Sequence, residues 1–223
     1  MSLTGEGVGA DLPHMKLRSD SFNDGDHIAT RYALGKRSAD GKIELTENRN
    51  PHLGWSDLPA GTKSIVLLCY DRSAPTKPDD VNQEGREVPV DLPRADFAHW
   101  VLVDLAPEAS IAESAFSEGA TPHGKDGPEG PLRTRSGIND YTGWFAGDPD
   151  MAGDYYGYDG PCPPFNDALV HCYDFTAYAL DVERAPVEGK FTGPDVLSAI
   201  EGRVLGHATI GFKYAINPDA REL

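Results

Sequence analysis

The segment Lys63-Ser64-Ile65-Val66-Leu67-Leu68-Cys69-Tyr70 decides the fold class of this chain. It is a nearly unbroken apolar run of the length of one β-strand, and such a run is typical of a strand that is buried on both faces. The next residues, 71–96, are rich in proline and in charged side chains. We therefore expect them to leave the sheet as a long excursion.

Working outward from this run, further segments carry strand signals: residues 97–105, 171–182 and 204–214, and the shorter stretches 28–34 and 43–45. Residues 107–116 are predicted to form a short helix. A second helix is predicted over residues 193–203, because Pro194 suits the first helical turn. The sequence thus predicts a mainly β protein with one or two short helices.

The composition favours one turn-rich domain. Glycine (24) and proline (18) are frequent in the 223 residues and show no repeat period. All-β proteins of this length usually form a single domain. Residues 1–25 are polar and glycine-rich, so we predict a flexible N-terminal lead-in there and one domain over residues 26–223.

The formal charge of −16 excludes several classes of partner. A surface this acidic repels a phosphate backbone, so no nucleic acid is expected. Anionic lipid would not dock on it through a basic patch, and no apolar stretch reaches the ~18 residues of a membrane span, so no stable membrane anchoring is predicted. The odd count of three cysteines, without a signal peptide, favours reduced thiols and a cytoplasmic protein.

Two candidate polar residues follow or lie within the strongest strands. Asp71 directly follows the first strand, where it caps nearby amides of a turn, orients a histidine, or accepts a hydrogen bond from an ammonium headgroup. His99 lies among apolar residues, so it is either a satisfied core histidine or an imidazole that contacts a bound phosphate oxygen.

The segment Gly157-Tyr158-Asp159-Gly160-Pro161-Cys162-Pro163-Pro164 is a second candidate region. Gly160 permits close backbone approach, and the prolines stiffen the loop, so it either rims a ligand or is a stiff turn. His171 and Tyr173 are two residues apart and share one face of a strand. With His99 they would offer hydrogen bonds to an anion, or they simply end a strand.

Three competing kinds of site rest on weaker patterns. Cys162 and His171 have the residue types of a thiol nucleophile and its base. Asp71, His99 and His171 have the types of a zinc or iron site, but without tight local spacing. Asp148, Asp150 and Asp154 suggest calcium, but the glycine and terminal glutamate of an EF-hand loop are missing. We therefore expect no metal, cofactor or catalytic residue.

The order of several motifs resembles the phosphatidylethanolamine-binding (Raf kinase inhibitor-like) family, in its bacterial and archaeal YbhB/YbcL-type branch. The resemblance covers roughly residues 28–214 and is carried by these motifs: Asn50-Pro51-His52-Leu53-x-Trp55, Asp71-x-x-Ala74-Pro75, His99-Trp100-Val101, Asn139-Asp140-Tyr141, Gly157-Tyr158-x-Gly160-Pro161-Cys162-Pro163-Pro164 and His171-x-Tyr173-x-Phe175.

The resemblance implies an antiparallel β-sandwich with a small anion pocket at one end. Carried over by position, the pocket would consist of Asp71, His99, Gly160, Pro163, Pro164, His171 and Tyr173. Its expected ligand is a small anion such as phosphate, or a phospholipid headgroup such as phosphoethanolamine. Relatives of this branch are commonly dimeric, so a homodimer is expected as well.

This chain departs from the family pattern at several places. Ser73 stands where the family usually has a second Asp, and Cys172 stands where it often has Arg. The segments 75–96 and 142–156 look longer than usual, and a C-terminal helix of eukaryotic members is not expected after Tyr214. The rim of the pocket is therefore expected to differ from that of relatives.

Three hypotheses of different classes result. The first is a cytoplasmic binding protein for an anionic headgroup, held by His99, His171 and Tyr173 with Asp71 orienting an imidazole. The second is a regulatory inhibitor of a kinase or protease, which would use the long segments at the rim. The third is an enzyme, either a metal-assisted hydrolase or a Cys/His acyl-transfer enzyme. The first is the hypothesis that we favour.

Overall fold

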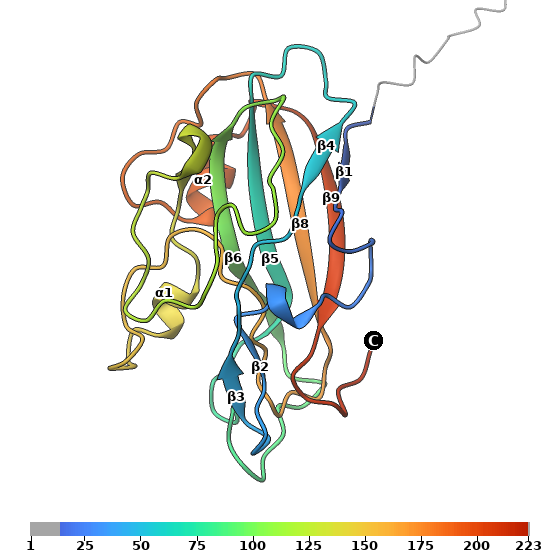
Figure 1. Cartoon of the computed structure of the whole chain (residues 1–223), viewed down its shortest axis with the longest axis vertical. Coiled ribbons are helices and arrows are strands. Elements are labelled where there is room, and N and C mark those ends of the chain that lie inside the picture. The colour runs from blue at the N-terminus through green and yellow to red at the C-terminus, as the bar shows by residue number, and fades with distance from the viewer. Residues whose placement is uncertain (1–13, 223) are drawn as a thin grey trace, which may run out of the picture.

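A computed structural model describes residues 14–222, and its centre is a five-stranded antiparallel sheet with the strand order β7-β6-β5-β8-β9 (Figure 1). The strands of this sheet are β5 (Ser64–Pro75), β6 (Arg94–Leu105), β7 (Arg135–Ser136), β8 (His171–Leu180) and β9 (Val204–Tyr214). Two small antiparallel ribbons accompany it, β1 (Lys16–Arg18) with β4 (Gly54–Ser56) and β2 (Gly35–Arg37) with β3 (Ile43–Leu45). The helices of the described residues are short: α1 (Tyr141–Trp144), α2 (Gly193–Ala199) and the 3₁₀ turns Thr30–Tyr32 and Pro131–Arg133.

Strand β5 lies at the centre of the sheet and is covered on both faces. Ile65 and Leu67 point into one core, and their neighbours Val66 and Leu68 point into the other. This alternation confirms that the continuous apolar run is a strand buried on both sides. The mainly β, antiparallel fold class predicted from the sequence is thereby confirmed.

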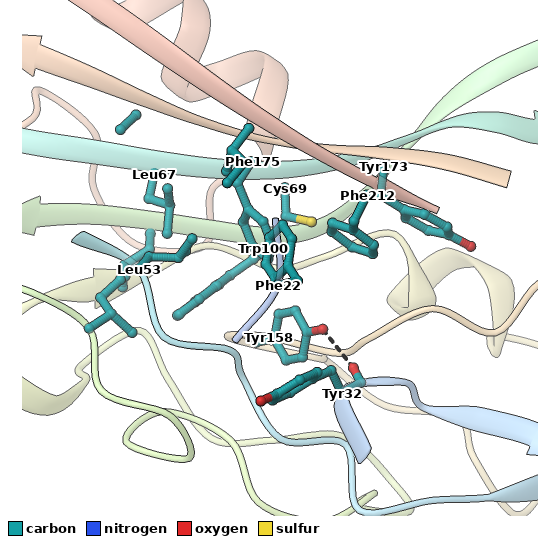
Figure 2. Packing of buried hydrophobic residues seen from close by; sticks show 14 of the residues in the cluster. Phe22, Tyr32, Leu53, Leu67, Cys69, Trp100, Tyr158, Tyr173, Phe175 and Phe212 are labelled. Carbon is teal, nitrogen blue, oxygen red and sulfur yellow. Dashed lines mark hydrogen bonds between the residues drawn. The ribbon is translucent and has the colours of Figure 1, made fainter. Parts of the chain in front are cut away.

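The larger core is rich in aromatic side chains (Figure 2). Trp100 is fully buried, and its ring centroid lies 5.4 Å from that of Tyr158 and 6.5 Å from that of Phe175. The Tyr158 hydroxyl donates a 2.6 Å hydrogen bond to the Tyr32 carbonyl, so the polar tip of a buried ring is satisfied. This core lies against the face of the sheet that also carries the candidate site residues Asp71 and His99.

Helix α2 covers the opposite face of the sheet, where Val196 and Ile200 pack with Val66 and Leu68. It begins with a capping box: the Thr192 hydroxyl accepts from the amide of Asp195, and the Asp195 carboxylate accepts from the Thr192 amide at 2.8 Å. The helix ends at Ala199, four residues before the predicted end at Arg203.

Strand β9 has the bounds predicted from the sequence, as does β3.

Three predictions about local structure are wrong. Residues 28–34 contain a 3₁₀ turn, not a strand, because a short apolar run does not distinguish a strand from a buried irregular segment. Residues 107–116 contain no helix, since Ile111 exchanges two backbone hydrogen bonds with Leu53 instead. The excursion predicted for 71–96 is shorter, because β5 and β6 stay paired as far as Pro75 and Arg94.

The predicted flexible lead-in over residues 1–25 needs a similar correction. Residues 1–13 lie outside the described residues. Residues 14–25 are placed, however: β1 pairs with β4, and Met15 and Phe22 are buried in the larger core. The polar composition of residues 1–25 gave no indication that these two apolar side chains are buried, and their burial holds the segment against the sheet. The prediction of one domain over residues 26–223 stays a prediction.

Candidate functional site

Strand register brings the sequence-predicted site residues to one end of the main sheet. Asp71 of β5 lies opposite Phe97 of β6, and His99 follows two residues along the same strand. On the other side of β5, His171 is the first residue of β8. Asp71, His99 and His171 line one cavity of about 550 Å³. Pro163 and Pro164 also line it.

The buried ring of His171 is held by carboxylates on both sides. Its Nδ1 lies 2.7 Å from Asp71 Oδ2, and its Nε2 lies 2.9 Å from Asp167 Oδ2. Asp167 is also bound by Arg94, whose guanidinium donates two hydrogen bonds of 2.6 and 3.0 Å. Because ionised carboxylates only accept, both ring nitrogens must donate, and the ring is an imidazolium.

The pKa values of this cluster agree with that assignment. Burial by itself lowers the pKa of His171, but the charge of Asp71 and the hydrogen bonds to Asp167 and Asp71 outweigh it and raise the pKa to about 9. Burial favours a raised pKa for Asp167, but the hydrogen bonds from His171 and Arg94 lower it overall. His171 and Asp167 are therefore both charged at neutral pH.

This geometry changes the role of His171. We expected its imidazole to donate to a bound anion, but neither ring nitrogen is free while Asp71 and Asp167 hold it. The expected contact between Asp71 and an imidazole is present, and that imidazole is His171. The carboxylate of Asp71 is fixed further by the Ser73 amide, which donates to Oδ1 at 2.7 Å.

The ring of His99 offers the cavity a nitrogen that the protein does not use. Its Nδ1 lies 2.8 Å from the carbonyl oxygen of Asp159, so Nδ1 carries the proton. Within residues 14–222, Nε2 has no hydrogen-bond partner. Burial lowers the pKa of His99, against the opposing charges of Asp71 and Asp159, so the ring is neutral at pH 7. Nε2 then presents a lone pair.

A buried network fixes the carbonyl that holds His99. The side chain of Asp159 accepts hydrogen bonds from Asn48 Nδ2 and Asn139 Nδ2, each at 2.8 Å. Lys125 Nζ lies 3.0 Å from the same carboxylate. Because these three donors hold Asp159 from different segments, they set both the orientation and the tautomer of His99.

Tyr173 and Gly160 do not line the cavity itself. The hydroxyl of Tyr173 is buried and has no partner among the described residues. Figure 2 shows it pointing away from the other labelled core side chains. The ring centroids of Tyr173 and His99 are 5.3 Å apart. Burial raises the pKa of Tyr173 well above its usual value, so the hydroxyl stays a donor.

Gly160 lies outside the cavity and is hydrogen-bonded to a residue of the cavity wall. Its amide donates to Asn48 Oδ1 at 2.8 Å, and its carbonyl accepts from the Tyr141 hydroxyl at 2.8 Å. A Cβ at this position would come within 2.0 Å of the Tyr32 carbonyl oxygen. The backbone approach expected for this glycine is therefore toward the protein itself, where it holds Tyr141 in the cavity wall.

Three observations on the described residues concern the thiol, the metal ligands and the membrane. Burial raises the pKa of Cys162 to about 12, so the thiol in the cavity wall stays protonated. Among residues 14–222 no three His, Cys, Asp or Glu side chains are grouped so that they could hold a metal ion. In that same range no helix has the length and apolar character of a membrane span.

Sequence reasoning missed Asp167 and Arg94. Asp167 precedes His171 by four residues, but it lies in the loop before β8, where that spacing has no fixed geometry. Arg94 lies 73 residues away from Asp167 along the chain. Sequence alone offers one weak signal: Arg94 comes just before the apolar segment of β6, and an arginine that is buried there needs a partner for its charge.

Comparison with known proteins gives a consistent result. The family model described as "Phosphatidylethanolamine-binding protein" matches residues 18–215. The UPF0098 protein YbhB of Escherichia coli (strain K12) is 32% identical over 196 residues, which cover 88% of this chain and 97% of YbhB. A UPF0098 protein of Methanothermobacter thermautotrophicus is 32% identical over 197 residues, covering 88% of this chain and 95% of that protein.

The fold is found in solved structures as well. The crystal structure of Escherichia coli YbcL superposes with a TM-score of 0.65 at 24% sequence identity, covering 92% of this chain and 99% of YbcL. This likeness supports the fold alone, whereas the match over residues 18–215 and the two relatives support common descent. The chain belongs to the phosphatidylethanolamine-binding protein family, in its bacterial YbhB/YbcL-type branch.

Proposed function

We propose that this protein binds a small molecule through an anionic, phosphate-like headgroup at the polar end of the cavity. The observation that carries the proposal is the unused Nε2 of His99, which a buried network aims at a cavity of about 550 Å³. The ring of Tyr173 packs 5.3 Å from that of His99, but its hydroxyl is buried and the residue does not line the cavity, so the proposal does not depend on it.

Binding of the headgroup to His99 requires one proton, which either the ligand carries or the imidazole takes up. A neutral His99 presents a lone pair, so it accepts from a protonated phosphate oxygen or takes up a proton when the anion binds. No lysine or arginine lines the cavity, while Asp71 and Asp96 do. We therefore expect weak binding, millimolar to micromolar or roughly 4–8 kcal/mol, that strengthens as the pH falls.

Binding without catalysis is part of the proposal. The thiol of Cys162 lies in the cavity wall, but its pKa of about 12 makes it a poor nucleophile. Three unpaired cysteines support a cytoplasmic location, which we also propose. Inhibition of a kinase or protease through the rim stays a prediction, as does the homodimer.

The test is a titration with inorganic phosphate and with phosphoethanolamine, followed by NMR of the imidazole signals. We expect a saturable shift of His99 that is larger at pH 6 than at pH 8, and loss of binding in His99→Asn. The matched control is His207→Asn, an exposed histidine on β9 outside the cavity. An unchanged affinity in His99→Asn would contradict the proposal.

A further inference from the structure

Lys125 is a largely buried lysine that reaches the candidate site only through Asp159. Its side chain is 15% exposed, and its Nζ lies 3.0 Å from Asp159 Oδ1 and donates to the Tyr158 carbonyl. The backbone carbonyl of Asp159 lies 2.8 Å from His99 Nδ1, and the Asp159 amide donates to the His99 carbonyl at 3.1 Å. Only Asp159 therefore separates this ammonium from the ring of His99, although Lys125 does not line the cavity.

The backbone around Lys125 brings its side chain to this buried carboxylate. The Lys125 amide donates to the Asp154 carbonyl at 2.8 Å. The two stretches approach so closely that a Cβ at Gly124 would collide with the Asp154 carbonyl oxygen, and a Cβ at Gly153 with that of His123. Glycine at both positions thus permits the approach. Because burying an ammonium is unfavourable unless it is paired, the position of Lys125 depends on the charge that it meets.

Three carboxylates act on the ring of His99. Burial lowers the pKa of His99, whereas the charges of three carboxylates raise it: Asp71 of β5, Asp140 before α1, and Asp159. Asp71 is paired with His171 at 2.7 Å. Asp140 has no ion pair among residues 14–222 and accepts a backbone hydrogen bond at 2.6 Å. The charges of Asp71 and Asp159 are thus each met by one cation, and that of Asp140 is not.

The ammonium of Lys125 controls how strongly the charge of Asp159 acts on His99. The two tyrosines that pack against the ring, Tyr141 and Tyr173, add no charge, because burial raises the pKa of each hydroxyl well above its usual value. A negative charge nearby favours the protonated form of an imidazole, and a cation that cancels this charge favours the neutral form. Lys125 therefore acts against protonation of His99 from outside the cavity.

We propose that Lys125 is a positioning residue that limits the affinity of His99 for anions, because its ammonium cancels the charge of Asp159 and keeps the ring neutral. This inference rests on the proposed function, in which His99 contacts the ligand. It makes a prediction that a purely structural role does not make. Loss of a structural contact would weaken anion binding, whereas loss of this charge should strengthen it.

The test compares Lys125→Met with Lys125→Arg and Lys190→Met in the full chain. Lys190 pairs with Asp154 at 2.5 Å and is 51% exposed, so its loss changes the net charge equally without touching Asp159. In Lys125→Met the NMR titration of the His99 imidazole should move to higher pH. The affinity for inorganic phosphate, measured by calorimetry at pH 7, should rise by about 3- to 10-fold. Lys125→Arg and Lys190→Met should match the wild type.

Two further variants keep the test decisive. Lys125→Gln removes the charge but keeps a hydrogen-bond donor, so it should move the His99 titration in the same direction if the methionine variant does not fold. Asp159→Asn added to Lys125→Met removes the carboxylate as well and should return the titration to that of the wild type. A double variant that stays shifted would show that the charge of Asp159 is not the cause, which overturns the inference.

The two readouts separate this inference from the proposed function. An unchanged His99 titration in Lys125→Met and Lys125→Gln would overturn the inference, and so would a phosphate affinity that falls or stays the same where the wild type binds phosphate. If the wild type does not bind phosphate but the His99 titration moves in Lys125→Met, the proposed function is wrong and the control of the His99 charge by Lys125 stands.

Discussion

The charge on His171 predicts a fall in stability at mildly alkaline pH. Its folded-state pKa of about 9 is raised above the ordinary value of 6.5 by Asp71 and Asp167. A raised pKa means that the folded state binds the proton more tightly than the unfolded state. The stabilisation is therefore fully present below about pH 6.5 and is lost as the pH rises through about 9.

The size of the effect follows from the two pKa values. A shift from 6.5 to about 9 is worth on the order of 3 kcal/mol of unfolding free energy when the ring is protonated in both states. Between about pH 7 and about pH 8.5, roughly 2 kcal/mol of this is lost. His99 acts in the opposite sense and at lower pH, because its pKa is lowered and it is neutral throughout this window.

Urea unfolding at a series of pH values measures the effect. The wild type should lose about 2 kcal/mol across the window, whereas His171→Gln should start about 3–5 kcal/mol less stable and lose much less with pH. NMR titration of the wild-type imidazole gives an independent value if the variant fails to fold. A His171 pKa near 6.5, or an equal pH dependence in the variant, would refute the imidazolium assignment.

Three further predictions concern the frame around the site. Gly160→Ala should lower the unfolding free energy by more than about 1 kcal/mol in the same urea assay, because the added Cβ would lie 2.0 Å from the Tyr32 carbonyl oxygen. Its control is Gly147→Ala, where a Cβ would meet open space and the unfolding free energy should change by less than about 1 kcal/mol. Thr192→Ala removes the N-cap of α2 and should lower stability by about 1 kcal/mol, as read from the urea midpoint. Trp100→Ala empties a fully buried position and should cost about 3–5 kcal/mol; a loss below 1 kcal/mol would contradict the packing described.

The long strands could be predicted from sequence because their signal is local. The run from Ile65 to Cys69 is apolar on both faces, and that pattern has few solutions other than a central strand. Strand β9 alternates buried Ile210 and Phe212 with less buried neighbours, so its bounds were predicted correctly. Where the local pattern of apolar residues determines the structure, that pattern is sufficient to predict the strand.

The wrong predictions fall where distant residues decide the structure. The expected helix over 107–116 is replaced by contacts with a segment some sixty residues earlier. Leu53 pairs with Ile111, and the side chain of Asn50 accepts from the amides of Phe116 and Ser117 at 2.8 and 3.0 Å. These bonds satisfy the backbone groups that a helix would have used, so tertiary contact overrides local helix propensity.

The same reasoning explains why the site was predicted only in part. Ser73 and Cys172 are neighbours, since the Cys172 amide donates to Ser73 Oγ at 3.1 Å, and neither side chain brings a formal charge to this edge of the sheet. The charges that surround His171 come instead from Asp71, Asp167 and Arg94, which no local spacing connects.

A buried cluster of this kind must balance its own charge. Asp71 and Asp167 are neutralised by His171 and Arg94, and leaving out any one of the four would bury an uncompensated charge at a cost of several kcal/mol. A balanced cluster has no net attraction for an outside anion. Under the proposed function, the residue that contacts the ligand is therefore His99, whose neutral ring can gain a proton when a headgroup binds. On that proposal, the charge balance around His171 leaves His99 as the histidine that is available to an anion.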